Sequence, residues 1–259
     1  MIVDLHNHTK LCNHAEGEIS EYIEKAIECG IKHFGFSEHA PMNFDQKYRI
    51  SFEQMREYEK SVFDAKEKYK NSIEILLGYE VDYLRGYMDE RVLKADVDYL
   101  IGSVHFIEEW GFDNPEFIRN YKDQNIDEIW QKYFNAIEEM AKSRLFDIVA
   151  HLDLIKIFKY MPNKNINIIA KKALLAIKEA DMSIEINVAG FRKPIGEAYP
   201  SLALLKEIKK LGIPITFASD AHKPEQVGLY SDEAIEMAKI AGYKECVLYR
   251  KRQKKFIKF

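Results

Sequence analysis

Residues 2–8 read IVDLHNH, a short apolar run that ends in two histidines one residue apart. A run of this length and composition is typical of a buried β-strand. Residues two apart in a strand point to the same face, so the side chains of His6 and His8 are expected to lie together. Two imidazoles in that arrangement can bind one metal ion.

The same pattern, a β-like run that ends in histidine or a carboxylate, recurs along the chain. The segments are DLHNHT (4–9), FSEH (36–39), LLGYE (76–80), GSVH (102–105), VAHLD (149–153) and FASDAH (217–222). Segments of helical period separate them, which is typical of repeated βαβ units. Seven or eight such units predict an α/β fold, a distorted TIM-like barrel whose active site lies at the C-terminal ends of the strands.

The apolar periodicity sets the expected elements. The predicted strands are Ile2–Leu5, His33–Ser37, Ile73–Val81, Tyr99–Val104, Asp147–Ala150, Ser183–Val188, Pro214–Ala218 and Cys246–Tyr249. The predicted helices are Ser20–Cys29, Phe52–Tyr69, Arg91–Lys94, Ile126–Ser143, Asn167–Ala180, Ser201–Leu211 and Pro224–Ala241. No Gly/Ser-rich or Pro-rich linker interrupts them, so residues 1–259 are predicted to form a single domain.

Composition restricts the class of protein. Of 259 residues, 47% are apolar, enough for a large core, and the net charge of −4 gives no electrostatic reason to expect nucleic acid or a membrane surface as a partner. The three cysteines show no disulfide spacing, and the N-terminus lacks the features of a secretion signal. A cytoplasmic location is therefore expected, and no pattern indicates an oligomeric state.

The C-terminal residues 250–259 carry six basic side chains. Such a tail can bind nucleic acid or phosphate groups. The favoured interpretation is an edge strand that its lysines protect from aggregation.

Nine residues are candidate metal ligands, which is more than the three or four that one catalytic ion takes from a protein. They predict two or three ions. Imidazole and carboxylate donors suit Zn, Mn or Fe, whereas Mg or Ca would prefer oxygen throughout. His33 begins a strand at the opposite end and is predicted to face solvent, and Cys12 is interpreted as a small loop residue. The nine are His6, His8, His14, His39, Glu80, His105, His151, Asp220 and His222.

These motifs, in this order and over nearly the whole chain, resemble the PHP (polymerase and histidinol phosphatase) superfamily. The resemblance implies a distorted (β/α)7 barrel with a trinuclear metal centre. It assigns His6, His8, Glu80 and Asp220 to one ion. It assigns Glu80, His105 and His151 to a second, and His14, His39 and His222 to a third.

Residues 185–201, EINVAGFRKPIGEAYPS, are similar to the segment in which histidinol-phosphate phosphatases hold the phosphate with an arginine. The resemblance therefore implies Arg192 as the phosphate anchor, with a planar guanidinium that suits phosphate oxygens. A second basic residue is expected after the HLD motif, where Lys156 and Lys159 are the candidates.

The resemblance implies hydrolysis of L-histidinol phosphate to L-histidinol and phosphate, through attack by a hydroxide that bridges two ions. Asp220 and His222 are the candidates to protonate the leaving oxygen. The segment after His105 is expected to bind the cationic substrate, mainly through Glu108 and Trp110, with Glu109, Phe112 and Asp113 beside them.

Two alternatives remain open. The chain could be another phosphoesterase of the same superfamily that acts on sugar phosphates, nucleotides or phosphotyrosine. It could also be a metal-binding sensor module without catalysis. Turnover separates the sensor from the enzymes, and a panel of substrates separates the phosphatases.

Overall fold

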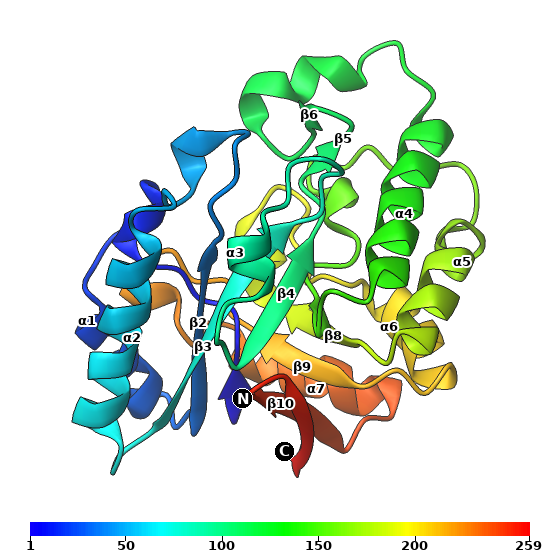
Figure 1. Cartoon of the computed structure of the whole chain (residues 1–259). Helices are drawn as coiled ribbons and strands as arrows, with labels where there is room; N and C mark the ends of the chain where they lie inside the picture. Colours follow the sequence, from blue (N-terminus) through cyan, green and yellow to red (C-terminus); the bar gives the residue numbers. More distant parts are fainter.

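Seven parallel strands form one sheet in the computed structural model, which describes residues 1–259 (Figure 1). In sheet order they are β1 (Val3–Asp4), β2 (His33–His39), β3 (Glu74–Asp82), β4 (Tyr99–Ser103), β7 (Ile148–Val149), β8 (Ser183–Asn187) and β9 (Ile215–Ala218). The two edges of the sheet also meet, because the N–H of Leu5 donates to the carbonyl of Phe217 at 3.0 Å and Asn7 pairs with Ala221 in parallel. The strands therefore close into the predicted TIM-like (β/α)7 barrel.

Helices cover the outside of the barrel (Figure 1). The apolar side chains of each recur every three or four residues, and this stripe packs against the strands. In the longest helix the stripe includes Trp130, Phe134 and Ile137, all buried. The helices are α1 (Ile19–Glu28), α2 (Met55–Tyr69), α3 (Glu90–Leu93), α4 (Ile126–Ser143), α5 (Ile166–Glu179), α6 (Leu202–Lys210) and α7 (Ser231–Ala241).

All the predicted strands and helices are present, with one interruption and one additional hairpin. The predicted helix over Pro224–Ala241 divides into the 3-10 turn η6 (Pro224–Gln226) and α7. Between them Gly228 has φ +71° and its N–H donates to Ser219 Oγ. The additional hairpin consists of β5 (Phe106–Ile107) and β6 (Trp110–Gly111), and the expected edge strand of the C-terminal segment is β11 (Gln253–Lys258).

Tyr99 fills the centre of the barrel and requires two glycines beside it. Its hydroxyl donates to the carbonyl oxygen of Leu5 at 2.7 Å. A Cβ atom at Gly35 would lie 2.0 Å from that hydroxyl oxygen, and one at Gly78 would lie 2.4 Å from the ring. The glycines of the predicted strands thus make room for an aromatic side chain that holds neighbouring strands together.

The basic C-terminal segment pairs with β10 (Glu245–Arg250) as an antiparallel hairpin, away from the β5–β6 end of the barrel (Figure 1). Its basic groups bind acidic residues of the barrel: Arg250 contacts Glu74 at 2.7 Å, and Lys254 contacts Asp181 at 2.8 Å. The backbone N–H of Arg252 donates to the carbonyl of Asp98. This arrangement agrees with the edge-strand interpretation, because the segment pairs as a strand with β10. Its basic side chains neutralise carboxylates of the barrel. No helix of the protein is long and apolar enough to span a membrane.

His33 lies at this same end and is half-buried beside Glu74, not solvent-facing as predicted. Partial burial raises the pKa of Glu74, but hydrogen bonds from His33 and Arg250 outweigh it and bring that pKa to about 2, below its usual 4.5. The stabilisation from this pairing is therefore complete above pH 4.5 and is lost as the pH falls toward 2.

Glu74→Gln should accordingly lower the urea midpoint of the metal-free protein at pH 6, because it removes that ion pair. The difference between wild type and variant should shrink between pH 4.5 and pH 3. A difference that stays constant or grows on acidification would contradict this pKa assignment.

Candidate metal centre

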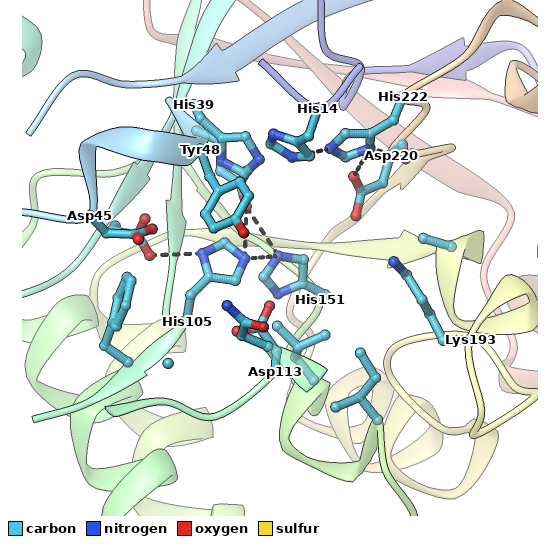
Figure 2. Close-up of a pocket in the computed structure, with 18 of the residues that line it drawn as sticks. His14, His39, Asp45, Tyr48, His105, Asp113, His151, Lys193, Asp220 and His222 are labelled. Carbon is cyan, nitrogen blue, oxygen red and sulfur yellow. Dashed lines mark hydrogen bonds and ion pairs between the residues drawn. The ribbon is translucent and has the colours of Figure 1, made fainter. Parts of the chain in front are cut away.

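The C-terminal ends of six strands deliver the candidate ligands to one place. His39 and Glu80 lie within β2 and β3, and the others follow the ends of β1, β4, β7 and β9 or lie in the loop after η1 (Lys10–Cys12). Parallel strands end at the same rim of a barrel, so segments distant in sequence converge there. Figure 2 shows six of the nine around one cavity, namely His14, His39, His105, His151, Asp220 and His222.

Glu80 occupies the centre of the cluster. Its Oε1 lies 3.0 Å from His151 Nε2 and 3.6 Å from His105 Nε2. Its Oε2 lies 2.9 Å from His39 Nδ1 and 3.3 Å from His6 Nε2. One carboxylate thus faces histidines from four other strands, which is the position that a bridging ligand requires.

Ligand atoms gather in three groups, each within a span of 4.8 Å, and the first two share Glu80. The groups are His6, His8 and Glu80; Glu80, His105 and His151; and His14, His39 and His222. Asp220 joins the first group, since its Oδ1 lies 3.3 Å from His8 Nε2. Cys12 lies within the same distance of His8 and His222, but its thiol donates to the carbonyl of Thr9.

The histidine nitrogens of the cluster are better placed to bind divalent cations than to form hydrogen bonds with one another. The Nε2 atoms of His6 and His8 are buried and make no hydrogen bond. The Nε2 atoms of His105 and His151 lie 3.1 Å apart, although His105 Nδ1 already donates to Asp82 at 2.7 Å. Buried polar atoms without partners are rare in proteins. Lone pairs that point at a common space are what a metal ion would satisfy.

The protonation states also suit a metal centre. Burial and the neighbouring His8 lower the pKa of His39 to about 4, so its imidazole is neutral near pH 7. Burial opposes ionisation of Glu80 and Asp220, yet the adjacent His6 holds the pKa of both well below the usual range. For His8, burial is outweighed by Asp220 and Glu38, which raise its pKa to about 9. A bound cation would displace that proton, so metal binding should release protons.

A cavity of about 500 Å³ opens beside the cluster. Arg192 lines it from η5 (Val188–Arg192), where its Nη2 donates to the carbonyls of Ser219 and Asp220 at 2.8 and 2.9 Å. Its Nη1 is shielded and has no protein partner. The position agrees with the predicted anion anchor, since one edge of the guanidinium is fixed and the other edge is free.

Four other expected substrate contacts do not line the cavity. Lys156 is fully buried, and its ammonium binds the carbonyl of Ala198 at 2.8 Å and the carboxylates of Asp153 and Glu197 at 3.0 and 2.9 Å. The prediction that it grips phosphate is therefore wrong. The other candidate anchor, Lys159, does not line the cavity either. The same is true of Glu108 and Trp110 in the β5–β6 hairpin.

Glu108 and Trp110 are occupied elsewhere. Glu108 is exposed and lies 3.5 Å from the ammonium of Lys132. The Trp110 ring packs edge-on against Tyr121, with ring centroids 4.7 Å apart. Further along the same segment, Asp113 does reach the cavity, as do Tyr48, Lys193 and Gln226. In the sequence, only its position next to Arg192 pointed to Lys193. Nothing in the sequence indicated that Tyr48 or Gln226 would line the cavity.

Comparison with known proteins agrees with this geometry. Residues 4–189 match the family model for the PHP domain, and residues 205–233 match a PHP-associated model. A probable histidinol-phosphatase of Deinococcus radiodurans is 34% identical over 97% of this chain and 98% of its own length. The histidinol-phosphatase of Bacillus subtilis is 29% identical over 89% of this chain and 97% of its own.

Among solved structures, the fold is similar to that of the histidinol phosphate phosphatase of Lactococcus lactis, solved with zinc, L-histidinol and phosphate. The TM-score is 0.80 with 22% identity, and the match covers 98% of both chains. The matched family model spans most of the present sequence and includes seven of the nine converging residues. On this evidence, the chain belongs to the PHP domain family.

Proposed function

We propose that this protein is a metal-dependent phosphatase that hydrolyses L-histidinol phosphate to L-histidinol and phosphate. The observation that carries the proposal is the cluster around Glu80 beside a cavity that also presents the free edge of Arg192. The relatives in Deinococcus radiodurans and Bacillus subtilis bear the name of this activity and match over nearly their full lengths.

The three groups of donors would hold two or three divalent transition metals, Zn, Fe or Mn, with Glu80 shared between them. Histidine and carboxylate together, with no coordinating cysteine, favour an open hydrolytic site over a structural one. When bound, the ions supply neutralisation of the phosphate charge and a lowered pKa for a bound water.

The chain's own residues would orient the phosphate. Arg192 binds its non-bridging oxygens through Nη1, while the carbonyls of Ser219 and Asp220 prevent the guanidinium from turning away. Lys193, exposed at the cavity edge, adds positive charge. We assign delivery of a proton to the leaving oxygen to Asp220 or His222, which line the cavity beside Arg192. The pKa of each is held below its usual range, by burial for His222 and, against the effect of burial, mainly by His6 for Asp220, so either would first take that proton from the attacking water.

The opposite side of the cavity would select the cationic part of the substrate. Figure 2 shows Asp113 beside His105 and His151, across the cavity from Lys193. No lysine or arginine pairs with Asp113, so its carboxylate is available to a substrate ammonium group. A ligand with phosphate at one end and ammonium at the other matches this distribution of charge.

Asp113→Asn should raise KM for L-histidinol phosphate by roughly 10- to 100-fold, because one charged hydrogen bond contributes about 1.5–3 kcal/mol. KM for p-nitrophenyl phosphate, which carries no ammonium group, should change little. Glu116→Gln is the matched control, since this carboxylate is exposed on the same segment outside the cavity. Equal effects on both substrates would remove Asp113 from the recognition of the amine.

The experiment that tests the proposed function is phosphate release from L-histidinol phosphate, measured beside sugar phosphates, nucleotides, phosphotyrosine and a phosphodiester. Chelated protein and protein reloaded with Zn²⁺, Mn²⁺ or Fe²⁺ are compared. A rate on L-histidinol phosphate far above the others, lost on chelation, is expected. Similar slow rates across the panel would support the alternative of a general phosphoesterase, and metal binding without turnover would support a sensor module.

The three cysteines are unpaired, and two of them are buried. Free thiols are typical of reducing compartments, so we place the enzyme in the cytoplasm.

A further inference from the structure

Strand β8 contributes no candidate ligand to the metal cluster, yet its last polar residues contact ligands from three other strands. We propose that Glu185, together with Asn187, is the positioning residue that holds these ligands in register and ties them to the phosphate anchor. The inference rests on the proposed metal centre and concerns residues that do not themselves reach the ions.

Glu185 accepts hydrogen bonds from three donors. Its carboxylate oxygens lie 2.9 and 3.1 Å from His6 Nδ1. Its Oε1 also accepts from the backbone N–H of His151 at 2.8 Å and from Asn187 Nδ2 at 2.7 Å. One side chain therefore connects a ligand of the first group to a ligand of the second.

Asn187 extends the connection to the remaining parts of the site. Its Nδ2 also donates to Asp220 Oδ2 at 3.0 Å, and its Oδ1 accepts from the backbone N–H of Ala189 at 2.9 Å. The second contact caps the start of η5, the turn that ends in Arg192. Hydrogen bonds with the backbone of Tyr199, at 2.7 and 2.9 Å, fix Asn187 itself.

The contact with His6 also determines which nitrogen can bind a metal. An ionised carboxylate only accepts hydrogen bonds, so the proton of a neutral His6 must be on Nδ1. Nε2 is then left with a lone pair, 3.3 Å from Glu80 Oε2. Partners of this kind fix the orientation and basicity of metal-bound imidazoles, and their loss typically weakens metal binding 10- to 100-fold.

The burial of Glu185 indicates a role in metal binding and not in the stability of the metal-free fold. Glu185 is fully buried, no lysine or arginine pairs with it, and the one cationic partner within reach is the candidate ligand His6. Burying a carboxylate is costly for the metal-free fold, and the contact with the His6 imidazole offsets only part of that cost. Its charge becomes favourable once cations occupy the neighbouring site. Glu185 should therefore contribute to metal binding and not to the stability of the metal-free protein.

The test compares the full-length wild type with Glu185→Gln, which keeps the size of the side chain and removes its charge. Both proteins are stripped of metal, and Zn²⁺ affinity is measured by competition with a chromophoric chelator. Thermal unfolding is recorded with and without Zn²⁺. Glu74→Gln is the matched control, because Glu74 contacts His33 Nδ1 in the same way at the opposite end of the barrel.

We expect Zn²⁺ affinity to fall roughly 10- to 100-fold in Glu185→Gln, while the metal-free Tm stays at or above that of wild type. The rise in Tm on adding Zn²⁺ should shrink accordingly. Glu74→Gln should bind Zn²⁺ as wild type does. Wild-type affinity in Glu185→Gln, or a metal-free variant that unfolds earlier or does not fold, would overturn the positioning role alone. A wild type that binds no Zn²⁺, Mn²⁺ or Fe²⁺ would overturn the proposed function with it.

Discussion

Glu80→Gln is expected to reduce kcat on L-histidinol phosphate by on the order of 10³-fold or more. The carboxylate lies within 3.7 Å of ring nitrogens of five histidines from four different segments, so it is shared among the donor groups. The amide has no charge and presents a donor where a cation should bind. Metal ions contribute several kcal/mol of charge stabilisation to such reactions, which corresponds to this loss of rate.

The measurement is kcat together with the metal content of the same purified sample. Glu59→Gln provides the control, because Glu59 is a partly exposed carboxylate that accepts from the hydroxyl of Tyr79, the neighbour of Glu80 on β3. The control should keep wild-type metal content and rate. If Glu80→Gln retained its metals and more than a tenth of the wild-type kcat, the bridging role of Glu80 would be wrong.

Arg192→Ala is expected to lower kcat/KM by roughly 10²- to 10³-fold. The guanidinium is held by two backbone carbonyls with its Nη1 unpaired, and loss of one preorganised donor to a charged group costs a factor of this size. Arg192→Lys should recover only part of the rate, because an ammonium cannot bind both carbonyls and grip phosphate along a planar edge.

Inhibition by inorganic phosphate checks the same assignment without turnover of substrate. The inhibition constant should rise in Arg192→Ala and much less in Lys193→Ala, whose side chain is exposed at the cavity edge. Unchanged inhibition by phosphate in Arg192→Ala would show that the anion binds elsewhere.

The convergence of the nine candidate ligands could be predicted from the sequence because of barrel geometry. A parallel barrel brings the C-terminal end of every strand to one rim, so a polar residue that ends an apolar run can be placed at that rim. The position of a residue that lies beyond a strand end is not determined in this way. Lys156 follows His151 by a few positions, but the 3-10 turn η4 (Leu154–Lys156) directs it into the protein, toward Asp153 and Glu197.

Glu185 and Asn187 on β8 could not be identified from the sequence, for a different reason. SIEIN alternates polar and apolar side chains, which is the pattern of a strand with one face in water. In the closed barrel both faces are covered, and all five residues are buried. Glu185 and Asn187 therefore belong to the interior of the site. The two-residue strands β5 and β6 are too short for any periodicity, whereas the lysines of β11 did indicate an edge strand, although not its partner β10.

Closure of the barrel between β1 and β9 has a consequence for how the protein is made. His6 and His8 precede Asp220 and His222 by more than 200 residues, and β9, the strand that closes the barrel against β1, ends only at Ala218. Pairing over so long a separation is slow and must wait for most of the chain. A nascent chain thus cannot complete the cluster until β9 and the residues after it have been synthesised, so the full set of metals can bind only after that point.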